Sequence, residues 1–169
     1  MRRQTVARRM LVLAVAVLVL AGASPAYAAK PERGPATPAL IESDVCAFPV
    51  QNSQEGNYTE TTFADGRIVI TGSGRDTVTN VDADISLTLK TSGKITITEV
   101  DGDQRLQASG RTLFWFYAGD QGPFGPVGAN GALYYIVGHV DQILDQELLL
   151  VTSFEWSGRA TELCSLISP

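Results

Sequence analysis

The sequence has little of what metal and nucleotide chemistry requires. Its 169 residues include one histidine, His139, and two cysteines, Cys46 and Cys164, with no C-x-x-C pair. A zinc site takes four nitrogen, sulfur or oxygen ligands, so this set predicts no metal site. No glycine-rich run ends in Gly-Lys-Ser or Gly-Lys-Thr, and no G-x-S-x-G motif occurs. We therefore expect neither a bound cofactor nor a phosphate loop.

Basic residues are also scarce. Four of the 13 Lys and Arg residues, but none of the 18 Asp and Glu residues, lie in residues 1–28, so the remainder has 9 basic against 18 acidic residues, a net charge of −9. Binding to nucleic acid or to an anionic membrane needs clustered basic side chains. We expect neither as a partner.

Residues 1–28 have the pattern of an export signal. Four arginines precede an uncharged apolar run at 10–21, and an A-x-A cleavage pattern follows at 26–28. A transmembrane helix is the alternative, but the run is shorter than the roughly 20 apolar residues that a span needs. The pair Arg8-Arg9 leaves both general and twin-arginine export open. We expect a secreted protein that has no membrane segment after signal cleavage.

The mature chain is expected to form one domain. Residues 29–43 contain three prolines and predict an extended linker, and 44–169 predict the folded domain. Cys46 and Cys164 lie near the two ends of that domain, which in an exported chain favours a disulfide that ties the termini together. Two free catalytic or metal-binding thiols are the alternative, without supporting spacing.

Strand patterns dominate the mature chain. Residues 84–90 alternate between apolar and polar side chains, and turn signals recur every eight to twelve residues, including Asp65-Gly66 and Thr91-Ser92-Gly93. No long helical period occurs. The sequence predicts an all-β fold: a single antiparallel β-barrel or barrel-like sandwich of about eight strands, with closure slightly preferred because it removes edges.

The stretch 112–140 differs from the other predicted strands. Leu113, Trp115 and Tyr117 share one face of the first strand and Phe114 and Phe116 share the other, so both faces are apolar and both need cover. A second sheet, a terminal segment, a protein partner or a ligand would supply it. Between this strand and the next, glycine recurs every third residue at 119–131; this predicts a flexible hairpin loop, or a recognition loop, rather than a collagen helix.

His139 is the candidate general base, because it titrates near neutrality and Asp141 follows on the same face of an extended chain. A catalytic site would also need a nucleophile, for which Ser109, Ser153 and Ser157 are candidates by residue type only. The enzyme interpretation is therefore an extracytoplasmic hydrolase or isomerase that uses His139 with nearby carboxylates.

The aromatic side chains support a different interpretation. They are more often core than binding site, but the interior of a barrel can hold an apolar ligand. We therefore expect a secreted, non-catalytic binding protein that engages a small apolar ligand or a protein partner near the 119–131 loop. A surface-interaction or oligomerising protein is a third hypothesis. The candidate ligand-binding residues are Trp115, Tyr117, Phe124, Tyr135 and His139.

Several segments resemble a known group of proteins. They are C-A-F-P-V at 46–50, the Asp-Gly and Ser-Gly turns, G-R-T-L-F-W-F at 110–116 and G-R-A-T-E-L-C at 158–164. Together they resemble small, uncharacterised, exported bacterial all-β proteins over residues 44–168. The rhythm of the strands also resembles that of lipocalin and allene oxide cyclase barrels, although the glycine-x-tryptophan start of lipocalins is absent. The resemblance implies export and an all-β fold, but no site residues.

Overall fold

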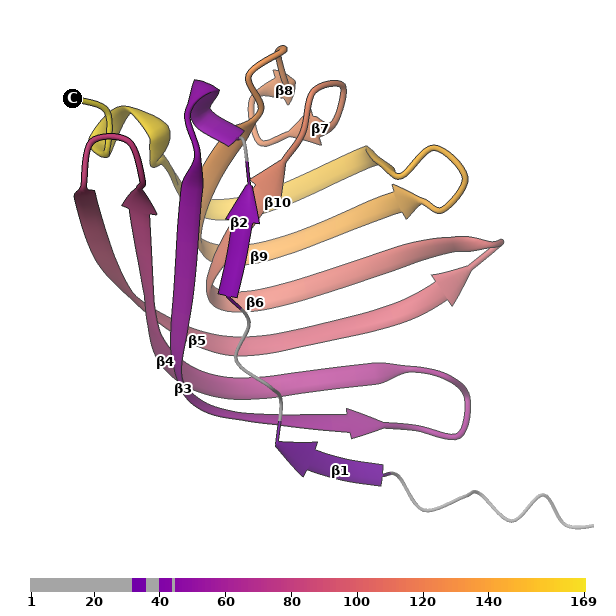
Figure 1. The fold of residues 1–169 in the computed structure, drawn as a ribbon. Coiled ribbons are helices and arrows are strands. Elements are labelled where there is room, and N and C mark those ends of the chain that lie inside the picture. Colours follow the sequence, from indigo (N-terminus) through magenta and orange to yellow (C-terminus); the bar gives the residue numbers. More distant parts are fainter. Residues whose placement is uncertain (1–31, 36–39, 44) are drawn as a thin grey trace, which may run out of the picture.

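The computed structural model describes residues 32–35, 40–43 and 45–169, so the predicted signal peptide lies outside the described residues. Within them the chain is almost entirely strand, with two 3-10 turns, η1 (Val45–Ala47) and η2 (Cys164–Leu166) (Figure 1). Neither of these turns, nor any other helix in the described part, is long and apolar enough to cross a membrane. The all-β prediction is confirmed.

One antiparallel sheet contains most of the strands, in the order β1-β3-β4-β5-β6-β9-β10, with β2 also paired to β3. The strands are β1 (Glu32–Pro35), β2 (Leu40–Ser43), β3 (Val50–Thr62), β4 (Ile68–Asn80), β5 (Ile85–Val100), β6 (Asp103–Phe116), β9 (Ala132–Asp145) and β10 (Leu150–Glu162). The pair β7 (Gln121–Gly122) and β8 (Gly125–Pro126) forms a separate hairpin. Within the described residues β10 pairs with β9 alone, so the sheet is a barrel-like sandwich and not a closed barrel.

The predicted hairpin at Asp65-Gly66 is confirmed, because Gly66 lies in the turn between β3 and β4 with φ of 82°. The predicted turn at Thr91-Ser92-Gly93 is wrong, since these residues lie inside β5. The polar stretch at 51–57, whose composition is typical of a loop, belongs to β3. Two pieces of the expected linker, β1 and β2, pair with β3.

The long strands of the sheet bend along their length (Figure 1), and a row of glycines crosses them. Its members, neighbours in register from β4 to β10, are Gly72, Gly93, Gly110, Gly138 and Gly158. Gly138 has φ of 151°, and a Cβ there would lie 1.9 Å from the carbonyl oxygen of Ser157. Only glycine permits backbones to approach this closely at such a bend.

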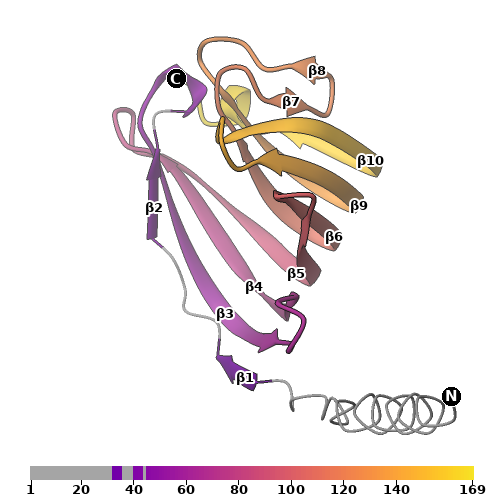
Figure 2. The same ribbon diagram turned by 90° about the vertical axis from the view of Figure 1, so that its right-hand side faces the viewer.

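The sheet divides in two just beyond this row. β5 and β6 pair from Val100↔Asp103 to Ser92↔Arg111 and no further, after which β5 continues beside β4 and β6 continues beside β9. The part of β5 before Ser92, with the parts of β4 and β3 beside it, thus forms one layer. The part of β6 after Arg111, with the parts of β9 and β10 beside it, forms another (Figure 2). Between them lies a core cluster that joins Val78 and Leu87 of the first layer to Leu113, Trp115 and Leu133 of the second.

The opposite face of β6 and β9 forms a second core cluster. Phe114 and Phe116 pack there with Ile136, and the ring of Phe116 lies 5.0 Å from that of Phe154 on β10. Both faces of β6 and β9 therefore pack against protein, although Tyr117, just past the end of β6, is 54 % exposed. On one face the cover comes from the layer of β3, β4 and β5 and from the residues around the disulfide. On the other face it comes from β10 and from side chains of β5, β6 and β9 on the far side of the glycine row.

The predicted disulfide is confirmed. Cys46 and Cys164 are bonded, with Cα atoms 5.1 Å apart and a sequence separation of 118 residues. Val45 and Ile167, which flank it, are buried in the first cluster. By the chain-entropy argument a bond that closes so long a loop stabilises the fold by about 4 to 5 kcal/mol.

Candidate functional site

A cleft opens at the point where β5 and β6 part. Its volume is about 230 Å³, and Ile70, Ile95, Leu113 and Trp115 supply apolar walls. Its polar lining includes Asn52, Tyr58, Asp76, Thr91 and Arg111. We call this space the split cleft.

Three polar side chains meet at the inner end of the split cleft because of the strand register. Asn52 is the partner of Val78, and Asp76 is two residues from Val78 along β4. Thr91 stands in the same diagonal relation to Asp76 on β5, since its partner is Gly74. Diagonal neighbours on one face of a sheet lie within side-chain reach. The Asn52 amide donates to Asp76 Oδ1 at 3.1 Å, and the Thr91 hydroxyl donates to Asp76 Oδ2 at 2.6 Å.

Tyr58 completes this network. Its hydroxyl lies 2.9 Å from Thr91 Oγ1. A threonine hydroxyl has one hydrogen, which Thr91 donates to Asp76, so Tyr58 must be the donor to Thr91. The hydrogen bonds therefore run from Tyr58 to Thr91 to Asp76, and the carboxylate is the final acceptor.

Glycines make room for the Tyr58 ring. A Cβ added to Gly74 would lie 2.5 Å from the Tyr58 hydroxyl oxygen, and one added to Gly72 would lie 2.6 Å from Cδ1 of the ring. On the other side, a Cβ at Gly56 would lie 2.9 Å from Cε2. The ring thus covers a bare patch of backbone, an arrangement that shields strand glycines and fixes the direction of the hydroxyl.

The network leaves one acceptor unused. Asn52 is 4 % exposed, and its Oδ1 has no hydrogen-bond partner among the described residues. Asp76 is 2 % exposed, and within residues 45–169 it forms no ion pair. Buried polar groups are almost always hydrogen-bonded, and buried charges are almost always paired. The inner end of the split cleft is an exception on both counts.

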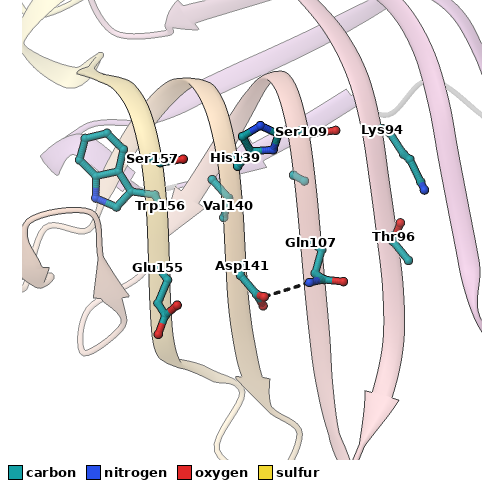
Figure 3. A pocket seen from close by; sticks show the side chains of 11 residues that line it. Lys94, Thr96, Gln107, Ser109, His139, Val140, Asp141, Glu155, Trp156 and Ser157 are labelled. Carbon is teal, nitrogen blue, oxygen red and sulfur yellow. Dashed lines mark hydrogen bonds between the residues drawn. The ribbon is translucent and has the colours of Figure 1, made fainter.

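A second, open depression of about 490 Å³ lies over β5, β6, β9 and β10 and contains His139 and Asp141 (Figure 3). The register places His139 between Ser109 and Ser157 on the neighbouring strands. His139 is exposed, and in the described part of the chain no hydrogen bond joins it to either serine or to Asp141. We call this surface the His139 face.

Asp141 is occupied by other partners. Arg105 donates to it through Nε at 2.8 Å and also through Nη2, and Gln107 donates at 3.0 Å (Figure 3 draws the Gln107 bond). The hydrogen bond from Arg105 is the main reason that the pKa of Asp141 is lowered from its ordinary value, and the pKa of Arg105 is raised in return. The geometry is that of a structural ion pair, so it does not orient His139 as a base.

The 119–131 loop folds onto the second core cluster. Phe124 is 70 % exposed, yet its ring lies 5.7 Å from those of both Tyr134 and Trp156, and Trp156 Nε1 donates to the carbonyl of Pro123 at 2.9 Å. Asp120 is buried and accepts from the backbone N–H of Val151 at 2.7 Å. The loop is thus anchored to β9 and β10, on the side of β6 and β9 away from the split cleft.

The candidate ligand-binding residues lie in different places. Trp115 lines the split cleft, and Tyr135 packs in the first cluster and donates to the carbonyl of Lys90 at 2.6 Å. Phe124 belongs to the anchored loop, Tyr117 lies exposed between β6 and β7, and His139 lies on its own face. Of the five, Trp115 alone is among the residues that line the split cleft.

Sequence reasoning missed the polar end of the split cleft. Asn52 lies in a polar stretch of β3 whose residue types do not indicate a buried strand, and Asp76 lies within the long strand β4. One signal was present, because Asp76 and Asn80 share a strand face with Val78, an apolar residue.

In the part of the chain that the structure describes, one group has three metal-type ligands: Cys46, Glu162 and Cys164. The two sulfurs are bonded to each other. The Glu162 carboxylate accepts from the backbone N–H groups of Cys164 at 2.6 Å and Ser165 at 3.0 Å. The group closes the end of β10 and does not have the character of a metal centre.

The resemblance to small exported bacterial β-proteins stays a prediction. No protein family, curated protein or solved structure was found to match the chain.

Proposed function

We propose that this chain is a secreted, non-catalytic binding protein that holds a small molecule in the split cleft. The observation that carries the proposal is one cleft that combines apolar walls, Ile70, Ile95, Leu113 and Trp115, with a buried polar end. Binding sites for small molecules have this composition, because apolar contact supplies affinity and a few polar groups supply orientation.

The size of the split cleft limits the ligand. Its volume, about 230 Å³, is below the range of about 300 to 1,000 Å³ that is common for drug-sized ligands. A ligand with one ring or a short branched chain fits such a space. Trp115 provides a flat surface against which a ring can pack.

Secretion is part of the same proposal. The disulfide between Cys46 and Cys164 supports it, because such bonds persist in oxidising compartments. The arginine-led apolar segment within residues 1–28 supports it independently.

The test is a titration of the 15N-labelled mature protein with toluene and with indole, followed by NMR. We expect the indole N–H signal of Trp115 to shift and that of Trp156, on the other side of β6 and β9, to stay in place. Ile70→Trp fills the cleft and should abolish the shift. Val81→Trp is the matched control, because Val81 is 53 % exposed in the turn after β4 and should leave binding intact.

Two results would contradict the proposal. One is the absence of any shift at Trp115 with either probe in a folded protein. The other is a set of shifts confined to Phe124 and its neighbours, which would place binding at the 119–131 loop. Thermal unfolding of both tryptophan variants checks that each of them folds.

A further inference from the structure

The polar end of the split cleft restricts the chemistry of the ligand, and this step rests on the proposed function. The Asn52 side-chain amide can be oriented with its oxygen or its nitrogen toward Asp76. A carboxylate accepts hydrogen bonds and repels another acceptor, so the nitrogen must face Asp76 and the oxygen must point elsewhere. Asn52 Oδ1 is therefore an acceptor, and it has no donor among the described residues.

The Asp76 carboxylate needs a partner for a different reason. It is 2 % exposed, and its donors are the neutral groups of Asn52 and Thr91. An ionised carboxylate has about four acceptor positions, so two donors leave capacity unused. A buried charge is stable when a charge of opposite sign lies against it.

The oxygen that lacks a donor belongs to Asn52 and the carboxylate that lacks a cation belongs to Asp76, and both residues line the split cleft. One group satisfies them together: a cation that carries several N–H donors. A protonated amine has three donors and a single positive charge, and charge-assisted hydrogen bonds to it are among the strongest in proteins.

We infer that the split cleft binds a small organic amine, with its protonated nitrogen held by Asn52 Oδ1 and the Asp76 carboxylate and its apolar body against Trp115, Leu113 and Ile95. The nitrogen supplies the missing donor and the missing positive charge. The aliphatic and aromatic walls then exclude water from the bound ion, which strengthens its attraction to Asp76.

Arg111 is the opposing charge. It lines the mouth of the split cleft and is exposed. At the mouth, water screens its repulsion of an entering cation, whereas the buried Asp76 acts with little screening. An anionic ligand would instead pair with Arg111 and would meet Asp76 as a like charge.

The test compares three probes of one shape: benzylammonium, benzyl alcohol and benzoate. Each is titrated into the mature protein, with calorimetry for affinity and the Trp115 indole signal for location. We expect benzylammonium to bind at least about tenfold more tightly than benzyl alcohol, the factor expected from one good charge-assisted pair. Benzoate should bind most weakly.

The variants remove the negative charge at position 76 and keep a side chain of similar volume there. Asp76→Asn should reduce the preference for benzylammonium over benzyl alcohol to about twofold or less, because the ionic part is lost. Asp65→Asn is the matched control, since Asp65 is exposed in the β3–β4 turn and should leave the preference unchanged. If Asp76→Asn does not fold, the pair Asn52→Leu with Asp76→Leu replaces the carboxylate together with its amide partner, and it should prefer benzyl alcohol.

The outcomes separate the two proposals. Equal affinity for the amine and the alcohol, or a preference for benzoate, with Trp115 shifting in each case, overturns the amine inference and leaves small-molecule binding in place. A preference for the amine that survives Asp76→Asn also overturns the inference. Failure of all three probes to shift Trp115 overturns both.

Discussion

Asp76 and Asp141 are two carboxylates in one sheet with opposite surroundings. Asp141, on the His139 face, has a side chain that is 30 % exposed and accepts from Arg105 and Gln107. Asp76, in the split cleft, is 2 % exposed and accepts from the neutral groups of Asn52 and Thr91. The partly exposed carboxylate has a cationic partner within the chain, and the buried one has none among the described residues.

The difference reverses the expectation from sequence. By residue type, His139 and Asp141 are the candidate catalytic pair. In the structure, however, the Asp141 carboxylate already accepts hydrogen bonds from Arg105 and Gln107. Asp76 lies in a strand without a recognisable motif. Among the described residues its carboxylate has no cationic partner, and the neighbouring acceptor, Asn52 Oδ1, has no donor. A site with unmet requirements is the better candidate for binding, because a ligand can satisfy them.

The largest effect is expected at the glycine row, which includes Gly93 of the split cleft and Gly138 beside His139. Gly138→Ala places a Cβ 1.9 Å from the Ser157 carbonyl oxygen, at a φ of 151° that alanine avoids. We expect a loss of about 3 kcal/mol or more in the free energy of unfolding, from strain and overpacking together. Urea unfolding followed by circular dichroism measures it. Gly128→Ala is the control, because its Cβ would meet nothing within 4 Å. Equal stability of the two variants would contradict the role of the glycine row.

Truncation of each carboxylate should separate the two regions by stability. Asp76→Ala leaves the buried donors of Asn52 and Thr91 without an acceptor, and we expect it to reduce the free energy of unfolding by about 1 to 3 kcal/mol. Asp141→Ala removes a partly exposed ion pair and should reduce it by less than about 1 kcal/mol. The same urea experiment tests both. The reverse order would contradict the larger contribution to stability that we assign to the Asp76 network.

The pH dependence of stability should report Asp141. Its pKa is lowered from the ordinary value of 3.8, chiefly by the hydrogen bond from Arg105, so the folded state favours the ionised form. The stabilisation is therefore complete above pH 3.8 and is lost as pH falls through the lowered pKa. Asp141→Asn removes it, so wild type should be slightly more stable than the variant at pH 6, and the difference should be smaller at pH 2. Thermal unfolding at both pH values provides the measurement, and a difference that grows in acid would contradict the assignment.

The smallest effect is expected at His139. The side chain is exposed, and no hydrogen bond involves it in the described part of the chain. We expect His139→Ala to change the free energy of unfolding by no more than about 0.5 kcal/mol and to leave the Trp115 titration unchanged. A loss of ligand binding in this variant would move the site to the His139 face and revive the catalytic hypothesis.

Local patterns were enough to predict part of the fold. The disulfide followed from the placement of Cys46 and Cys164, and the turn at Asp65-Gly66 followed from its residue types. The strands within 112–140 have apolar side chains on both faces, and this predicted that both faces are covered. The two core clusters supply that cover. Each of these inferences uses neighbouring residues or one unambiguous pair, so no knowledge of the sheet was necessary.

Gly93 shows why the rest was not predictable. Ser92-Gly93 resembles a turn when it is seen alone, but Gly93 lies between Gly72 and Gly110 in the row at the bend. The same limit applies to the binding site, since Asn52, Asp76 and Thr91 are 24 and 15 residues apart along the chain. Only the strand register brings them together.

By itself the sequence determined that this chain is built from strands, that its ends are joined by Cys46 and Cys164, and that the strands of its aromatic stretch pack on both faces, because alternation and cysteine placement are local properties. The tertiary structure alone decided that the sheet divides beyond Ser92 and Arg111 and that Asn52 and Asp76 lie at the end of the resulting cleft. The physical reason is that backbone pairing between distant strands, and not the identity of any one residue, sets which side chains share a buried space.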